Sequence, residues 1–373
     1  MKRKIFTTVA IMMVICLMVA GCSKTTTGTD TQNSNTPVET ATVTETEDSV
    51  ESSAPVEAKY IIRLGHSNPA VEGNIVQYAS EVFAEKVAEY SNGAIKVEIY
   101  PSNQLGDERD QMRALQNGSQ EMVYGSVQNF ATFAPQYYYL SLPYIFTSGE
   151  MAKKAIFELW DQHTEWMVEN GGMRPVGWAV AGFRNLSTSS DKPVRSLDDA
   201  KGVKVRIPPN AVSEAAFKAF GFEPVSLAFS EVFTALQQGV VDGQENCYTT
   251  IRAEHYDEVQ KYVTDIQWQY TIGIFAMSEI FYASLPADLQ EAVVQAGKDA
   301  TQAEMDMAAE LDAGDIAYLE EHGMVFLGLP TDYEEWVARG RSIWDSQYEL
   351  IGGGDAAAGK AIVDKVLEII EGS

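Results

Sequence analysis

Tyr60-Ile-Ile-Arg-Leu-Gly-His66 and Ile95-Lys-Val-Glu-Ile-Tyr100 lie near the start of the apolar-rich part of this chain. The first run is dominated by bulky apolar residues and reaches a glycine at Gly65, and the second alternates apolar with polar residues up to Pro101. Both patterns are typical of short β-strands. The fold class is predicted from the helical patterns between and after these two strands.

Helical patterns separate the strands of this region. Apolar residues spaced three and four apart predict a helix over 75–90, which Ser91-Asn92-Gly93 ends. A shorter helix is expected over 107–117, and residues 121–124 predict a third strand. This β-α-β-α-β order predicts a largely parallel sheet with right-handed crossovers.

A similar alternation returns later in the chain. It comprises a strand at 202–207, helices at 211–220 and 230–239, and a short strand and turn at 240–243. Two α/β units in one chain predict two lobes with a small-molecule cleft between them. We place the first lobe at about 60–183, completed by C-terminal segments, and the second at about 184–285.

Residues 286–321 have a different character, because after Pro286 they contain no further proline and only the glycines 297 and 314. One continuous helix would be about 50 Å long at ~1.5 Å per residue and would extend along both lobes. Two or three shorter helices broken at the glycines are the alternative. Two closing helices are expected at 332–348 and 356–370.

The N-terminus has the order of an export signal. Three basic residues at positions 2–4 precede an apolar run over 5–19, which is shorter than the ~20 residues of a membrane span. Val19-Ala-Gly-Cys22 resembles a bacterial lipobox. We therefore expect residues 1–22 to be a lipoprotein signal with Cys22 as the lipidated residue; an uncleaved N-terminal anchor is the alternative.

Residues 23–59 predict a disordered tether. They hold 10 Thr, 5 Ser and 7 acidic residues and no Ile, Leu, Met, Phe, Trp or Tyr, so they cannot bury enough apolar surface to offset the entropy of ordering. The folded domain is then 60–373, held near a membrane surface without entering it. This places the protein outside the cytoplasm, either in the periplasm or on the outer face of the cell membrane.

Composition excludes several functions. The chain of 373 residues carries 53 acidic and 27 basic residues, a formal net charge of −26, which excludes non-specific nucleic-acid binding. No phosphate-binding glycine loop, His-Glu-x-x-His, Cys-x-x-Cys or Gly-x-Ser-x-Gly motif is present, and the four histidines lie far apart in sequence. We therefore expect neither a metal site, a cofactor nor an enzyme.

Two arginines within apolar segments are the most informative charged residues. Arg184 lies in Trp178-Ala-Val-Ala-Gly-Phe-Arg-Asn-Leu186, and Arg206 lies in the strand that ends at Pro208. Alternation puts Arg206 on the face opposite Val205, where the end of the strand would reach the cleft. A guanidinium matches a carboxylate as a planar fork. The alternative is a structural salt bridge to an acidic residue of the chain.

Five ordered motifs carry a family resemblance. They are Gln104-Leu-Gly-Asp-Glu-Arg109, Gly182-Phe-Arg-Asn-Leu186, Gly202-Val-Lys-Val-Arg-Ile-Pro-Pro209, Leu227-Ala-Phe-Ser-Glu-Val-Phe-Thr-Ala-Leu-Gln-Gln-Gly239 and Val241-Asp-Gly-Gln-Glu-Asn246. Over roughly 60–329 the chain resembles the DctP-like substrate-binding proteins of tripartite ATP-independent periplasmic (TRAP) transporters. The resemblance implies an α/β, two-lobed periplasmic-binding-protein fold.

The resemblance also implies site residues. Arg206 matches the arginine that pairs with the ligand carboxylate, and Arg184 matches a second arginine that often contacts the ligand. The other expected ligand-binding residues are Asn246, Ser126, Asn68 and Asn74. Asn246 could instead be a turn residue, and Ser126 could instead be a strand-end cap. The sequence departs from the family pattern at Cys247, where a proline is usual.

The function expected from these features is capture of an organic acid anion by a monomeric lipoprotein outside the cytoplasm. The family implies delivery to the small and large membrane subunits of a secondary transporter. Two alternatives remain at this point: the solute-binding lipoprotein of an ATP-driven importer, and an extracellular enzyme or structural lipoprotein.

Overall fold

The first three strands form where the sequence predicted them. They are β1 (Tyr60–Gly65), β2 (Ile95–Tyr100) and β3 (Met122–Ser126), with α1 (Ile75–Tyr90) and α2 (Glu108–Gln116) between them. β1 pairs in parallel with both β2 and β3. The predicted β-α-β-α-β unit is therefore confirmed.

The structure is a computed structural model that describes residues 58–372. The expected signal sequence, Cys22 and nearly all of the expected tether lie outside these residues and stay predictions. In the described part of the chain, no helix combines the length and apolar character that crossing a membrane requires.

The strands of the described residues form one mixed sheet in the order β2-β1-β3-β8-β4-β7-β5-β6, with β9 (Val325–Phe326) beside β8. The central strands β4 (Met173–Thr188) and β8 (Tyr262–Ser278) are long and antiparallel to each other. β3 is antiparallel to β8, and β7 (Gly243–Asn246) is antiparallel to β4. The expectation of a largely parallel sheet is thus wrong at the centre, because two long strands of opposite direction join the two α/β units.

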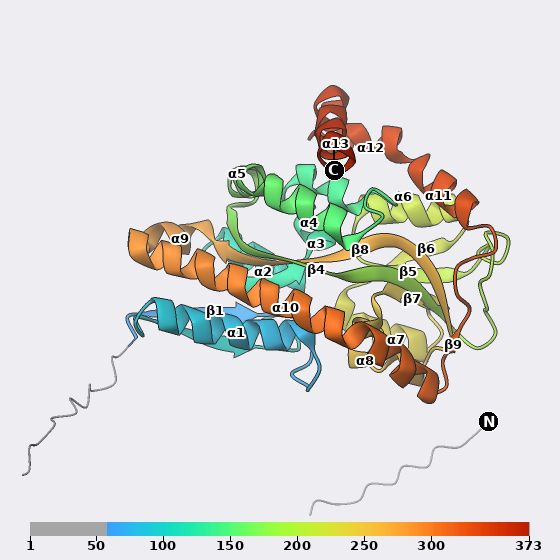
Figure 1. Ribbon diagram of the computed structural model, residues 1–373, viewed down its shortest axis with the longest axis horizontal. Helices are drawn as coiled ribbons and strands as arrows, with labels where there is room; N and C mark the ends of the chain where they lie inside the picture. Colours follow the sequence, from blue (N-terminus) through green and yellow to red (C-terminus); the bar gives the residue numbers. More distant parts are fainter. Residues whose placement is uncertain (1–57, 373) are drawn as a thin grey trace, which may run out of the picture. The chain divides into compact units, whose positions relative to one another are not determined.

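The second α/β unit lies at the other end of the sheet. There β5 (Lys204–Ile207) pairs in parallel with β6 (Glu223–Ser226) and β7. β4 and β8 run through both lobes (Figure 1). Residues 273–277, which fall in the range expected for the second lobe, pair with β3 of the first lobe.

The remaining elements cover the sheet. They are α3 (Val127–Phe130), η1 (Pro135–Ser141), α4 (Gly149–Glu158), α5 (Trp160–Gly171), α6 (Ala211–Phe220), η2 (Phe229–Glu231), α7 (Val232–Gln237), α8 (Tyr248–Ala253), η3 (Tyr256–Glu258), α9 (Glu279–Ser284), α10 (Ala287–Glu321), α11 (Tyr333–Arg341), α12 (Trp344–Ile351) and α13 (Ala356–Glu371). The closing helix expected at 332–348 is therefore two helices, and the strand expected at 240–243 begins only at Gly243.

Both faces of the sheet are buried in the first lobe. Ile272 and Ile274 of β8 belong to a core with α4, α5 and α13, whereas Phe275 and Met277 belong to a core with α1 and α10. Figure 1 shows these helix groups on opposite sides of the sheet. The alternation follows from the two-residue period of a strand.

Helix α10 is continuous over its 35 residues, with both glycines inside it. At ~1.5 Å per residue it is about 52 Å long. It packs against α1 of the first lobe, β4, and α8 of the second lobe. Of the two alternatives for 286–321, the structure therefore has the single helix spanning both lobes (Figure 1).

Candidate functional site

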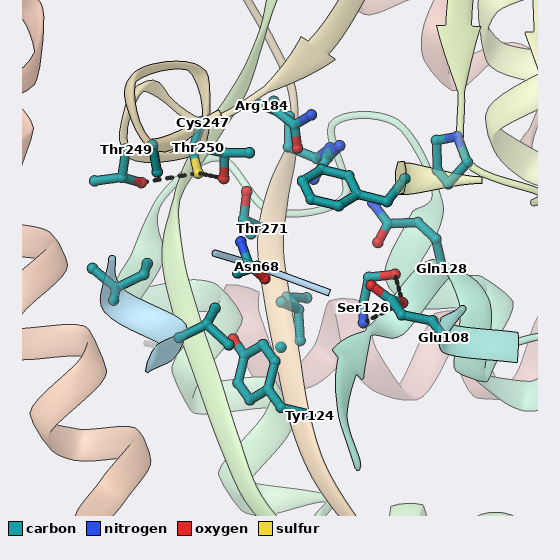
Figure 2. Close-up of a pocket in the computed structure, with 18 of the residues that line it drawn as sticks. Asn68, Glu108, Tyr124, Ser126, Gln128, Arg184, Cys247, Thr249, Thr250 and Thr271 are labelled. Carbon is teal, nitrogen blue, oxygen red and sulfur yellow. Dashed lines mark hydrogen bonds between the residues drawn. The ribbon is translucent and has the colours of Figure 1, made fainter. Parts of the chain in front are cut away.

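A cavity lies where the ends of β3, β5 and β7 meet the middle of β4 and β8. Both lobes and α10 contribute to its wall. It offers about 80 Å³ to the centres of water molecules, room for roughly six waters. All six expected ligand-binding residues line it: Asn68, Asn74, Ser126, Arg184, Arg206 and Asn246. Figure 2 shows part of this lining.

Arg206 is held in the cavity wall by β5. Val205 and Ile207 on the opposite face of this strand are buried in a core with α6 and α11, as alternation predicted. Arg206 is 2% exposed, and its Nε and Nη2 donate to the carbonyl oxygen of Leu227 at 3.1 and 2.9 Å. Its guanidinium also lies 5.9 Å from the ring centre of Phe229. Among the described residues, no carboxylate forms an ion pair with Arg206.

The missing counter-charge affects the electrostatics of Arg206. Burial is the largest effect on the pKa of Arg206 and lowers it. Tyr256 and Glu245 raise this pKa, the positive charge of Arg184 lowers it, and Glu108 raises it slightly, so the pKa is lowered on balance. A buried cation without a partner is costly. A ligand carboxylate at Nη1, which has no partner among the described residues, would relieve this cost.

Arg184 also lines the cavity, but it has an internal partner. Its Nε donates to Oε2 of Glu245 at 2.5 Å, and its Nη2 donates to Oε1 at 3.0 Å and to the Glu245 carbonyl at 2.7 Å. The two side chains are 6% and 0% exposed. Burial alone would lower the pKa of Arg184, but the Glu245 carboxylate holds it above its ordinary value. The structural salt bridge considered for both arginines is therefore present at Arg184.

The four remaining expected residues all make internal contacts. Asn246 ends β7, and its Nδ2 donates to Gln244 at 2.6 Å. Ser126 precedes α3 without capping it; its Oγ donates to Glu108 at 2.9 Å. Asn74 caps α1, with its Oδ1 accepting from two backbone amides. Asn68, in the loop after β1, accepts from the Ser102 amide through its carbonyl at 2.9 Å.

Several further polar residues line the cavity without having been predicted, and four of them matter here: Glu108, Asn129, Thr271 and Glu304. Glu108 lies in the 104–109 motif, which was the only sequence signal for any of them. Its Oε2 accepts from the Ser126 amide at 3.0 Å and from Asn129 Nδ2 at 2.7 Å. These hydrogen bonds hold the Glu108 carboxylate in the cavity wall.

Glu304 approaches the cavity from the middle of α10. Its Oε1 accepts from the Tyr124 hydroxyl at 2.5 Å, and burial raises its pKa to about 8. The absence of a side chain at Gly273 makes room for Tyr124, since a Cβ there would overlap the Tyr124 hydroxyl. Glu304 therefore carries its proton at neutral pH and adds little charge to the site.

Cys247 occupies the position of the family's usual proline. It directly precedes α8, at the N-cap position, with a φ of −72° that proline also adopts, so the turn keeps its form without the ring. The Cys247 sulfur lies 3.2 Å from the hydroxyls of Thr249 and Thr250 (Figure 2). Within residues 58–372 no cluster of three or more His, Cys, Asp or Glu side chains could hold a metal ion.

Comparison with known proteins shows which protein family this chain resembles. The family model of bacterial extracellular solute-binding proteins, family 7 (DctP), matches residues 64–350. A solute-binding protein of Roseobacter denitrificans is 36% identical over 279 residues, covering 74% of this chain and 84% of the relative.

Two solved structures are similar over the whole domain. A TRAP periplasmic solute-binding protein of Roseobacter denitrificans with bound L-galactonate has a TM-score of 0.74 at 30% identity, covering 83% of this chain and 99% of that one. One from Sulfurospirillum deleyianum with bound succinate has a TM-score of 0.76 at 31% identity, covering 84% and 100%.

The matched family consists of substrate-binding transport proteins rather than enzymes. Its two-lobed fold agrees with the sheet and the α10 helix described above. The chain therefore belongs to the DctP family, family 7 of the bacterial extracellular solute-binding proteins, which serve TRAP transporters.

Proposed function

We propose that this protein captures an organic acid anion outside the cytoplasm through an ion pair between the ligand carboxylate and Arg206. The observation that carries the proposal is the buried Arg206 guanidinium in the cavity wall, oriented by the neutral Leu227 carbonyl and left without a carboxylate partner among the described residues. Solved relatives with bound L-galactonate and succinate support an acid as the ligand.

Delivery to a transporter is the second part of the proposal. A ligand that contacts both lobes favours the closed arrangement of the lobes, because only that arrangement provides all the contacts. The closed form of the monomer then docks on the small and large membrane subunits of a TRAP transporter. A lipid on Cys22 and the tether over 23–59 keep the domain at the membrane surface. Membership of the DctP family disfavours an ATP-driven importer and an enzyme.

Isothermal titration calorimetry with the Arg206→Lys variant tests the carboxylate ion pair. Lysine keeps the charge and loses the planar fork, so we expect at least a tenfold loss of affinity for any acid that the wild-type domain binds. Arg339→Lys is the matched control, because Arg339 lies on α11, is 41% exposed in its side chain and pairs with Glu335. Equal affinity of wild type and Arg206→Lys would remove Arg206 from its proposed role.

A further inference from the structure

The solved relatives do not decide which acid this chain binds, because one holds a sugar acid and the other a dicarboxylate at nearly equal identity. We infer that the cavity selects a hydroxylated monocarboxylate, such as a six-carbon sugar acid, and rejects dicarboxylates, with Glu108 as the residue that makes the distinction. The inference rests on the proposed role of Arg206 and adds the chemistry of the rest of the ligand.

The positive charge of the cavity suffices for one carboxylate. Arg184 and Arg206 are the only basic residues among those that line it in the described chain. Glu245 neutralises Arg184 through two hydrogen bonds, whereas no carboxylate of residues 58–372 forms an ion pair with Arg206. A dicarboxylate would bring a second negative charge for which the wall has no free cation, and desolvating that charge is costly.

Glu108 makes one part of the wall acidic. Figure 2 shows Glu108 beside Ser126, at a different edge of the cavity from Arg184. Glu108 uses Oε2 for three hydrogen bonds from Ser126 and Asn129, whereas Oε1 has only the long 3.4 Å contact with Ser67. A carboxylate of the ligand near Glu108 would meet a like charge, whereas a hydroxyl would donate to Oε1.

Unpartnered polar atoms in the same wall also point to hydroxyl groups. Asn129 Oδ1, Thr271 Oγ1 and Glu304 Oε2 are buried and lack a hydrogen-bond partner in the described chain, and all three residues line the cavity. Buried polar atoms in folded proteins nearly always have partners. Hydroxyl groups of a ligand suit these three atoms. A hydroxyl can donate to Asn129 Oδ1, and it can accept from the Thr271 hydroxyl or from protonated Glu304.

A six-carbon ligand panel separates the effects of charge and hydroxyl groups. Calorimetry with the wild-type domain would compare three hexonates (galactonate, gluconate and gulonate), the matched diacids galactarate and glucarate, and the deoxygenated acids adipate and hexanoate. We expect the best hexonate to bind at least 30-fold more tightly than each diacid and than hexanoate.

The Glu108→Gln variant tests the residue itself. We expect it to weaken hexonate binding about tenfold or more, because a charge-assisted hydrogen bond is lost, and to strengthen diacid binding, because the like charge is removed. Glu150→Gln is the control, since the Glu150 side chain is 90% exposed on α4. Thr271→Val should weaken the hexonate and leave hexanoate unchanged.

The outcomes distinguish this inference from the proposed function. Tightest binding of adipate, galactarate or glucarate would overturn the inference while leaving the role of Arg206 intact. Unchanged selectivity in Glu108→Gln would likewise overturn it. Failure of every acid to bind, with the protein folded by circular dichroism, would overturn the proposed function and the inference together.

Discussion

The Nε and Nη2 groups of Arg206 both donate to the carbonyl oxygen of Leu227, at 3.1 and 2.9 Å. This pair of bonds orients the guanidinium without neutralising it, because a carbonyl carries no net charge. Arg184 presents the opposite case, since the Glu245 carboxylate both orients and neutralises it. Two arginines that look equivalent in the sequence therefore have different roles, and only Arg206 has charge to spare for a ligand.

Breaking the Arg184–Glu245 pair should strongly destabilise the domain. Arg184→Met leaves the carboxylate of Glu245 buried without its cation, and we expect a loss of about 3–5 kcal/mol in the free energy of unfolding by urea. The double variant Arg184→Met/Glu245→Gln removes the stranded charge and keeps an acceptor for the Trp268 indole N–H, which now donates to Glu245. It should recover most of the loss. Equal loss in both variants would contradict the pairing.

The two glycines of α10 should respond oppositely to alanine. At Gly314 a Cβ meets nothing within 4 Å, so Gly314→Ala should stabilise the domain by about 0.8–1.0 kcal/mol through helix propensity. At Gly297 a Cβ would overlap the backbone carbonyl of Val176 on β4, so Gly297→Ala should destabilise it. Urea unfolding of the two variants checks this, and stabilisation by Gly297→Ala would show that α10 does not approach β4 this closely.

Stability should depend on pH through Glu304. Burial raises the pKa of Glu304 from 4.5 to about 8, so the folded state holds this proton more tightly than the unfolded state. The free energy of unfolding of the wild type, relative to Glu304→Gln, should therefore fall by a few kcal/mol as pH rises from about 4.5 to 8 and then level off. Other groups titrate in both proteins and cancel in the difference. A difference that is constant between pH 5 and 8 would contradict the assignment.

Cys247→Pro should be tolerated. The φ of −72° at Cys247 suits proline, so the substitution should stabilise the ligand-free domain by about 0.4–1 kcal/mol by restricting the unfolded chain. Cys247→Ala is the control for loss of the thiol contacts with Thr249 and Thr250. The midpoint of thermal unfolding measures the effect, and a lower midpoint for proline than for alanine would show that the Cys247 amide is needed as a donor.

Local patterns were sufficient to predict the outer parts of the fold. The helix over 75–90 and the strand over 95–100 have the predicted bounds, because their apolar spacing repeats within one element. The central strands β4 and β8 were not predicted, since the direction of a strand and its partners depend on contacts between residues far apart in sequence. The sequence could not decide whether α10 is one helix, because it contains two glycines. The reason for Gly297 is its close approach to the Val176 backbone, which only the structure shows.

The site residues, too, could be predicted only where the signal lies within one segment of the sequence. Alternation in its strand predicted the face that Arg206 occupies, and the family resemblance implied its role as the carboxylate-binding residue. The neutralisation of Arg184 could not, since Glu245 lies on β7 and meets β4 only through sheet pairing. Glu304 reaches the cavity from α10, which lies outside the five motifs, so no sequence signal pointed to it.

The structure of the domain with its acid bound is the most direct test of the role of Arg206. We expect a carboxylate oxygen of the ligand within about 3.2 Å of Arg206 Nη1, with the two bonds to Leu227 kept. A ligand carboxylate paired elsewhere, with Arg206 still bonded only to Leu227, would contradict the proposed mechanism of capture.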